Sequence, residues 1–237
     1  MKKVKIVLTF AFAFSACTFY DNFEIDQMHD ATADIENRSS GDDSGSKKIS
    51  GSEETKSSSS SVKSSFNCGS NFTDSRDKAT YATVKIGSQC WFAENLNYAV
   101  QNSICFDDVY ENCNKYGRLY RWSEAQSACP EGSRLPTQSD WEELDAYLGN
   151  AVVAGKYLKA EDAWDNAEDA FGFGALPAGY YNADEEESMQ QGAVAYFWSL
   201  TETGTDAYAR ILKNNSNNLE VRESPKTNKL SVRCLID

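Results

Sequence analysis

The sequence predicts an α+β domain over residues 66–237. Two or three helices are expected first, followed by an antiparallel sheet in the C-terminal part, and disulfides are expected to cross-link the fold. One stretch in the middle of this region repeats its apolar residues at helical spacing. Four extended runs rich in β-branched and aromatic residues follow it towards the C-terminus. The region also contains six of the chain's seven cysteines, an even number that can form three disulfides.

The best-marked helix is expected to begin at Thr137. The pattern Thr137-x-x-Asp140 resembles a capping box, in which the two side chains satisfy backbone groups at the start of a helix. Trp141, Leu144 and Leu148 then recur at positions i, i+3 and i+7. The glycine-rich stretch that follows is expected to be irregular.

Strands are expected on both sides of this helix. Before it, two short strands flank a Gly87-Ser88 turn, and a third extended run follows later. After it, the strands are joined by turns. The expected segments are residues 81–86, 89–92, 116–121, 194–200, 208–213, 218–222 and 230–236.

The first 16 residues predict export. Three lysines among the first five residues precede an apolar core at residues 6–14, which is shorter than the roughly 20 residues that a membrane-spanning helix needs. Ser15-Ala16-Cys17 resembles a bacterial lipoprotein box. The resemblance implies cleavage before Cys17 and lipidation of this residue, which anchors the protein to a membrane.

A tether and one domain are expected after the cleavage site. Residues 17–65 are rich in serine and acidic residues and contain little apolar material, so we expect a lipidated, disordered tether. Residues 66–237 are long enough to bury a core as a monomer. They contain 15 Lys and Arg against 26 Asp and Glu, a net charge of −11, which argues against a nucleic-acid partner.

Lipidation of Cys17 leaves six cysteines in an oxidising compartment. Six cysteines allow about fifteen connectivities, among which composition alone does not choose. A four-thiolate zinc site is the alternative, and it is disfavoured because oxidation consumes thiolates.

Six motifs occur in a fixed order along the domain: Thr73-Asp74-Ser75-Arg76-Asp77, Thr83-Val84-Lys85-Ile86-Gly87, Trp91-Phe92-Ala93-Glu94-Asn95-Leu96-Asn97-Tyr98, Tyr116-Gly117-Arg118-Leu119-Tyr120, Arg134-Leu135-Pro136 and Ser231-Val232-Arg233-Cys234. Together they resemble the Fibrobacter succinogenes major paralogous domain, a family of exported and often lipid-anchored bacterial proteins. The function of the family is not established, so the resemblance implies a fold more than an activity.

A second resemblance concerns the cysteines. Trp122-x-x-Ala125-x-x-x-Cys129-x-x-Gly132-x-x-Leu135 is similar to the helix signature of C-type lectin-like domains, in which the helix cysteine pairs with one on the last strand. The resemblance implies a lectin-like fold and a bond between Cys129 and Cys234. Of the others, Cys105 and Cys113 flank a short loop and are expected to pair, which leaves Cys68 with Cys90.

Catalytic groups are scarce. The only histidine, His29, lies in the tether, so the domain has no imidazole for a nucleophilic triad or a histidine-bearing metal site. Residues 134–142 also resemble the formylglycine-generating enzymes, which use a pair of reactive cysteines near the end of their domain. Only Cys234 stands there, so such an enzyme, or an inactive relative, is the alternative to a binding protein.

No resident cofactor is expected. Lectin-like folds suggest calcium, but the domain lacks the Glu-Pro-Asn, Gln-Pro-Asp and Trp-Asn-Asp triplets that hold it in lectins. Asp184-Glu185-Glu186-Glu187 is an acidic run that could hold a hard cation, although a solvated loop is favoured. No metal ligand is therefore assigned.

Aromatic residues are the remaining candidates for a binding site. Four of the five tryptophans sit within structural motifs and are expected in the core. Trp164, Tyr180 and Tyr181 lie in the irregular middle, where loops carry function, and we expect them to face a ligand.

The sequence thus predicts a lipid-anchored binding module of the bacterial cell envelope rather than an enzyme. Aromatic side chains suit a carbohydrate ligand, and another protein is the second ligand class. Thr18 follows the lipidated cysteine where an aspartate would favour retention in the inner membrane, so we expect the outer membrane.

Overall fold

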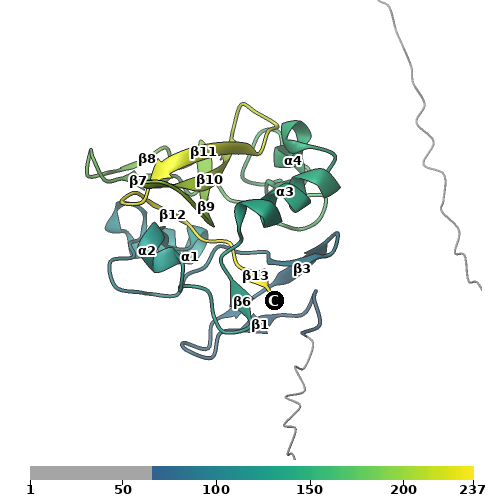
Figure 1. Ribbon diagram of the computed structural model, residues 1–237, viewed down its shortest axis with the longest axis horizontal. Coiled ribbons are helices and arrows are strands. Elements are labelled where there is room, and N and C mark those ends of the chain that lie inside the picture. Colours follow the sequence, from purple (N-terminus) through teal and green to yellow (C-terminus); the bar gives the residue numbers. More distant parts are fainter. Residues whose placement is uncertain (1–65) are drawn as a thin grey trace, which may run out of the picture. The chain divides into compact units, whose positions relative to one another are not determined.

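The computed structural model describes residues 66–237 (Figure 1). The predicted signal peptide, the lipidation site Cys17 and the tether lie outside the described residues. The described part has an α+β architecture, as the sequence predicts. Its helices are the 3₁₀ helix η1 (Phe106–Asp108) and the α-helices α1 (Tyr110–Tyr116), α2 (Trp122–Ala125), α3 (Gln138–Tyr147) and α4 (Ala151–Leu158).

A central sheet of seven strands forms the larger part of the domain. Its strand order is β11-β10-β9-β12-β7-β8, and β5 also pairs with β12. All of these pairs are antiparallel except β12 with β9, where Ser231 lies opposite Phe197 in parallel register. The strands are β5 (Leu119–Arg121), β7 (Tyr180–Asn182), β8 (Glu187–Met189), β9 (Val194–Thr203), β10 (Asp206–Lys213), β11 (Glu220–Pro225) and β12 (Lys229–Ser231).

A second sheet of four strands has the order β3-β4-β13-β6. Figure 1 shows it below the central sheet, with the C-terminus at β13. The predicted turn at Gly87 is confirmed, because β3 and β4 form an antiparallel hairpin there. These strands are β3 (Thr83–Ile86), β4 (Gln89–Phe92), β6 (Ser133–Arg134) and β13 (Leu235–Ile236), and a separate pair is formed by β1 (Phe72–Thr73) and β2 (Thr80–Tyr81).

The expected last strand is divided between the two sheets. Residues 230–236 were predicted as one strand, but β12 belongs to the central sheet and β13 to the smaller one. The three residues between them, 232–234, cross from one sheet to the other and are buried. This crossing places Arg233 in the interior between the two sheets.

The predicted capping box at the start of α3 is confirmed. The Thr137 hydroxyl accepts a hydrogen bond from the Asp140 amide at 3.2 Å, and the Asp140 carboxylate accepts one from the Thr137 amide at 2.6 Å. Both terminal nitrogens of Arg134 also donate to this carboxylate. Although burial alone would raise the pKa of Asp140, the hydrogen bonds from Arg134 and Thr137 lower it to about 2.

Two predictions about secondary structure were wrong. Tyr116 belongs to helix α1 rather than to an extended run, and the strand begins only at Leu119. Gly117 ends the helix at a φ of 75°, a conformation that suits glycine. The middle of the chain is also more regular than expected, because it contains α4 and the β7–β8 hairpin.

Apolar residues pack on both faces of the central sheet. One cluster lies between the sheet and helices α3 and α4 and includes Trp141, Phe173 and Phe197. The other lies on the side of α2 and includes Tyr120 and Trp198. None of the helices within residues 66–237 is long and apolar enough to span a membrane.

Three disulfides cross-link the domain. Cys129 is bonded to Cys234, Cys105 to Cys113, and Cys68 to Cys90. These are the three pairs expected from the sequence. The first joins the segment after α2 to the crossing segment beside Arg233, across a separation of 105 residues.

Candidate functional site

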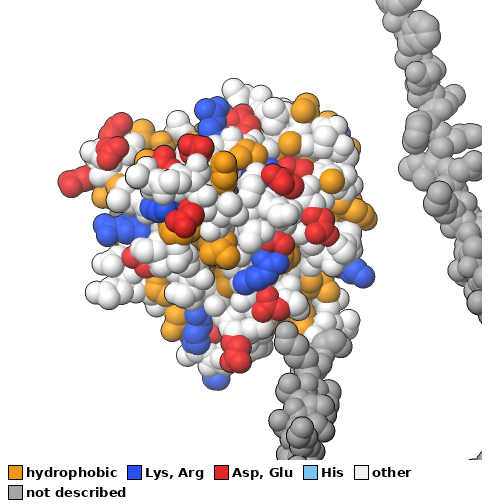
Figure 2. Space-filling model, viewed as in Figure 1, with side chains coloured by type: hydrophobic (Ala, Val, Ile, Leu, Met, Phe, Trp, Pro, Cys, Tyr) orange, Lys and Arg blue, Asp and Glu red, His pale blue; other side chains and the backbone are white. Residues whose placement is uncertain are grey.

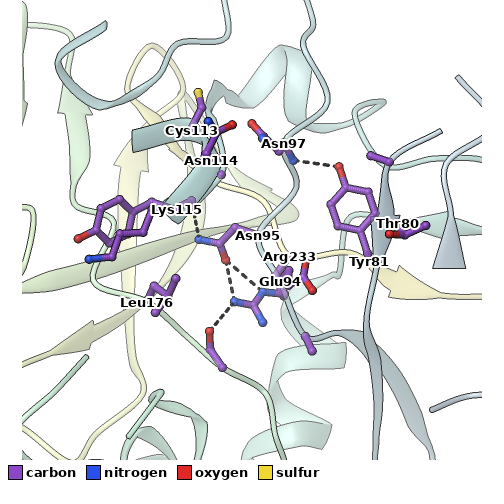
Figure 3. Close-up of a pocket in the computed structure, with 15 residues that line it drawn as sticks. Thr80, Tyr81, Glu94, Asn95, Asn97, Cys113, Asn114, Lys115, Leu176 and Arg233 are labelled. Atoms are coloured by element: carbon purple, nitrogen blue, oxygen red, sulfur yellow. Dashed lines mark hydrogen bonds between the residues drawn. The ribbon is translucent and has the colours of Figure 1, made fainter. Parts of the chain in front are cut away.

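A polar pocket with a volume of about 290 Å³ opens beside Arg233 (Figure 3). Five parts of the chain build it: β2, the segment that follows β4, the last turn of α1, the loop that precedes β7, and the crossing segment that contains Arg233. The lining residues are 79–81, 93–95, Asn97, 113–117, Gly174, Leu176 and Arg233. We call this cavity the Arg233 pocket.

Arg233 is fully buried and uses all of its donors within the protein. Nε and Nη2 both donate to Asn95 Oδ1, at 3.1 Å and 2.7 Å. Nη1 donates to the carbonyls of Phe92 and Phe173, and Nη2 also lies 3.5 Å from the carbonyl of Gly174. No carboxylate of the described residues forms an ion pair with it, and burial lowers its pKa to about 9. Arg233 therefore positions the pocket wall.

Asn95 extends this network to two further elements. Its Nδ2 donates to the carbonyl of Tyr116 at the end of α1, at 2.8 Å, and lies 3.4 Å from the Ser231 hydroxyl on β12. Gly117 allows this close approach, because a Cβ there would lie 2.7 Å from the Asn95 Cβ. The pocket wall is thus fixed by hydrogen bonds and close packing.

Two neighbouring residues present polar groups that the protein does not fully use. The Tyr81 hydroxyl accepts a hydrogen bond from the Asn97 amide at 3.1 Å, and burial raises the pKa of Tyr81. The Asn97 side chain forms no hydrogen bond with any residue in the described part of the chain, and its Oδ1 is shielded from water. Figure 3 shows these two residues side by side along one wall.

The charged residues of the pocket are few and of opposite sign. Glu94 is exposed and accepts a weak hydrogen bond from the Ala82 amide at 3.4 Å. Lys115 is exposed on α1, and its Nζ lies 4.9 Å from the centre of the Tyr116 ring. The lining therefore offers hydrogen-bonding groups and aromatic rings, with one carboxylate and one exposed ammonium.

This set of groups limits the chemistry of the pocket. Hydrolysis of a glycosidic bond generally uses two carboxylates, and the lining contains only Glu94. The one cysteine in the lining, Cys113, is bonded to Cys105 and carries no free thiol. The arrangement suits recognition of a polar molecule.

A family model for the Fibrobacter succinogenes major domain matches residues 84–235, which is more than half of the chain. The chain belongs to this family. Searches among curated proteins and among solved structures gave no match.

In this Fibrobacter succinogenes major domain, three motifs that lie far apart in the sequence meet at the Arg233 pocket. Residues 91–98 supply Glu94, Asn95 and Asn97, residues 116–120 supply Tyr116, and residues 231–234 supply Arg233. All three lie within the matched region. Nearly half of the pocket lining therefore comes from segments that carry the family resemblance.

The prediction that Trp164 faces a ligand was wrong. Only 6% of Trp164 is exposed, and it belongs to the cluster packed against α3 and α4. Its Nε1 donates to the Ala175 carbonyl at 2.7 Å, and the Lys159 ammonium lies 5.0 Å from its ring centre. The segment around Trp164 packs against the domain and is not a solvent-exposed loop. Helix α4 and residue 175 enclose the indole.

Tyr180 and Tyr181 lie on β7 and are not among the residues that line the Arg233 pocket. Both are half-buried. The Tyr180 ring lies 4.6 Å from the Tyr196 ring, and the Lys229 ammonium lies 4.9 Å from the Tyr181 ring. Their contact with a ligand stays a prediction, and the structure does not bring them together with Trp164.

The acidic run 184–187 forms the tip of the β7–β8 hairpin and is exposed. No group of three or more acidic, histidine or cysteine side chains in residues 66–237 is arranged to hold a metal ion. On the face drawn in Figure 2, acidic and basic side chains are interspersed, and no extended basic surface is visible on that face.

The sequence argument missed Tyr81, Asn97 and Arg233 as site residues, although all three lay in segments singled out for other reasons. A usable signal was present for Arg233. It interrupts the largely apolar run 230–236, and a charged residue in a strand-like apolar run is either exposed or held by buried polar partners.

Proposed function

We propose that this protein is a lipid-anchored binding module of the bacterial cell envelope and that its ligand, a carbohydrate, enters the Arg233 pocket. The observation that carries the proposal is the composition of the lining. Asn97 and Tyr116 offer neutral hydrogen-bonding groups, and Tyr116 also offers a half-buried aromatic ring, the kind of surface that hydroxyl-rich sugar rings require.

The size and charge of the pocket favour a sugar over a protein ligand. About 290 Å³ is at the lower end of the volumes of small-molecule sites, and protein partners generally bury a wider surface. Glu94 and Lys115 have opposite charges, so the lining does not select strongly for an ion. A protein ligand is an outcome of the experiments below.

A C-type lectin-like fold is consistent with this proposal. In lectin-like domains the helix cysteine pairs with a cysteine of the last strand, and here the segment after α2 is bonded to the segment between the last two strands. The formylglycine-generating alternative is less well supported. That chemistry needs reactive cysteines, whereas all six cysteines of residues 66–237 are in disulfides.

Attachment through Cys17 is proposed from the lipoprotein box, which lies outside the described residues, and Thr18 favours the outer membrane. Changing Cys17 to Ser should abolish incorporation of a fatty-acid analogue and move the protein from the detergent-extracted membrane fraction to the soluble one. The fatty-acid label is expected on Cys17, whereas a domain cysteine such as Cys68 is part of a disulfide. Labelled wild-type protein should therefore keep its label after reduction and alkylation of the six domain cysteines. A labelled Cys17→Ser variant would refute the proposed anchor.

The pocket proposal predicts that changing Tyr116 to Ala weakens glycan binding at least about tenfold, or about 1.4 kcal/mol. The ring lines the pocket, and its removal deletes a stacking surface. The measurement is a glycan array probed with full-length protein in detergent, followed by titration of the best ligand.

Tyr181→Ala is the matched control, because it deletes a half-buried tyrosine ring outside the lining. If Tyr181→Ala abolishes binding while Tyr116→Ala does not, the site is the β7–β8 hairpin and the pocket proposal is wrong. If no glycan is retained, a carbohydrate ligand is excluded for the glycans tested, and a protein ligand becomes the leading proposal.

A further inference from the structure

Two cationic side chains face each other on the central sheet, outside the Arg233 pocket. Arg121 on β5 lies directly opposite Lys229 on β12 in antiparallel register, and Lys229 lies opposite Tyr181 on β7. Directly opposite residues of antiparallel strands project from the same face of a sheet, with their Cβ atoms about 4.5–5.5 Å apart. The three side chains therefore form a continuous row across three strands, which we call the Lys229 row. None of them lines the Arg233 pocket.

The two cations of the row have no anionic partner in the described part of the chain. Neither Arg121 nor Lys229 takes part in an ion pair or donates a side-chain hydrogen bond there. They stay unpaired although the domain contains 26 Asp and Glu against 15 Lys and Arg. Like charges directly opposite each other destabilise a sheet, and an anion bound between them would remove this repulsion.

Lys229 is built into the fold rather than attached to its surface. Only 8% of the residue is exposed, yet its Nζ is not shielded from water and lies 4.9 Å from the centre of the Tyr181 ring. Burial lowers the pKa of Lys229, and the positive charge of Arg121 lowers this pKa further. Lys229 therefore presents a positioned amino group with unused donors, beside the exposed guanidinium of Arg121.

Two carboxylates on neighbouring elements limit the charge that the row can accept. Asp108 at the end of η1 and Glu124 on α2 oppose the lowering of the Lys229 pKa, so their fields reach the row. Neither forms an ion pair, and one oxygen of Glu124 is buried without a hydrogen bond from the described residues. These carboxylates and the domain's net charge of −11 disfavour a dianion or a polyanion. A single negative charge on an otherwise neutral molecule fits best.

A carboxylate matches the groups that the row offers. The planar guanidinium of Arg121 can donate two parallel hydrogen bonds to it, and the Lys229 amino group adds a point charge. Tyr181 contributes a half-buried ring and a hydroxyl that forms no hydrogen bond with the described residues. Among sugars, a uronic acid carries one carboxylate on a hydroxyl-rich ring that can pack against an aromatic side chain.

We propose that Arg121 and Lys229 bind the carboxylate of a uronic acid carried on a largely neutral glycan. This second site is separate from the Arg233 pocket, and it rests on the proposed function only in that the ligand is a carbohydrate. A neutral glycan has no charge for the Lys229 row, so Tyr181→Ala stays the control for neutral ligands of the pocket.

Two oligosaccharides isolate the carboxylate. One is xylotriose that carries a single glucuronic acid residue, and the other is the same molecule with its carboxylate reduced to a primary alcohol. Titration calorimetry with full-length oxidised protein in detergent should give a Kd for the acidic form at least about tenfold lower than for the reduced form. The difference should shrink in about 1 M sodium chloride, because salt screens exposed charges. Inorganic phosphate at the concentration of the sugar should not displace the acidic form.

Variants assign the preference to the two cations. Arg121→Gln removes an exposed charge, and Lys229→Met removes the amino group while keeping most of the buried apolar stem. Each should bring the two Kd values within about threefold of one another. Arg222→Gln is the matched control, because it removes an exposed arginine of the same sheet on β11, and the preference should persist. Thermal melts by circular dichroism should show that every variant is folded.

The outcomes separate this inference from the proposed function. Equal affinity of the wild-type protein for the two sugars overturns the inference, and a loss of both on Tyr116→Ala then leaves the Arg233 pocket as a sugar site. A preference that survives Arg121→Gln and Lys229→Met, or that Arg222→Gln removes equally, overturns the assigned residues. Displacement by phosphate would show a site for phosphate groups and overturn the uronic acid. Absence of binding also overturns the inference, and the glycan array then decides the pocket proposal separately.

Discussion

Replacing Trp164 by alanine is expected to lower the free energy of unfolding by about 3–5 kcal/mol, the usual loss for a buried tryptophan. The indole is 6% exposed, packs in the cluster beside α3 and α4, and donates a hydrogen bond to the Ala175 carbonyl. Its removal would leave a cavity and take away one of the two hydrogen bonds that the Ala175 carbonyl accepts, the other coming from the Ala160 amide. Denaturant unfolding followed by circular dichroism, under oxidising conditions, measures the effect.

Two further variants make the Trp164 prediction specific. Trp164→Phe keeps most of the apolar volume but removes the N–H donor, so it should cost clearly less than the alanine variant. Tyr110 is 65% exposed, and Tyr110→Ala should change stability by no more than about 0.5 kcal/mol. A Trp164→Ala loss as small as that of Tyr110→Ala would contradict the buried position.

Removing the bond between Cys129 and Cys234 is the second change with a large expected effect. The bond spans 105 residues, and the chain-entropy model gives about 4.7 kcal/mol for a loop of about 100 residues. The double variant Cys129→Ala/Cys234→Ala should lose about 3–5 kcal/mol. In a domain of this size that lowers the melting temperature by roughly 10 °C, which differential scanning calorimetry can measure.

The bond between Cys105 and Cys113 provides the control. It spans 8 residues, for which the same model gives about 2.5 kcal/mol. Cys105→Ala/Cys113→Ala should therefore be the milder double variant. The reverse order of the two losses would show that local packing around α1, rather than loop length, determines how much each disulfide stabilises the domain.

Local signals in the sequence predicted local structure well. The capping box at Thr137 was identifiable because its two partners lie three residues apart, and the β3–β4 hairpin because its turn contains Gly87. The cysteine pairs followed from a resemblance and from proximity in the chain. In each case the interacting residues are close in the sequence or belong to a recognisable sequence motif.

Long-range assembly explains what sequence reasoning did not find. Helix α4 is short, and Gly155 within it is required because a Cβ there would lie 2.4 Å from the Asn218 carbonyl, a contact that only the folded chain creates. Trp164 looked like a loop residue because the segment around it forms no regular helix or strand. The Arg233 pocket joins segments far apart along the chain: Asn95 and Arg233, which share hydrogen bonds, are separated by 138 residues.

The division of residues 230–236 between two sheets also determines when the fold can be completed. β12 contacts β5, β7 and β9, whereas β13 joins β4 to β6, so the final eight or so residues provide the central pairings of both sheets. A chain whose last residues have not yet joined the fold lacks these pairings. Such non-local pairing is slow to form. Late closure from the C-terminus would also delay formation of the bond between Cys129 and Cys234 until β12 and β13 have joined their sheets.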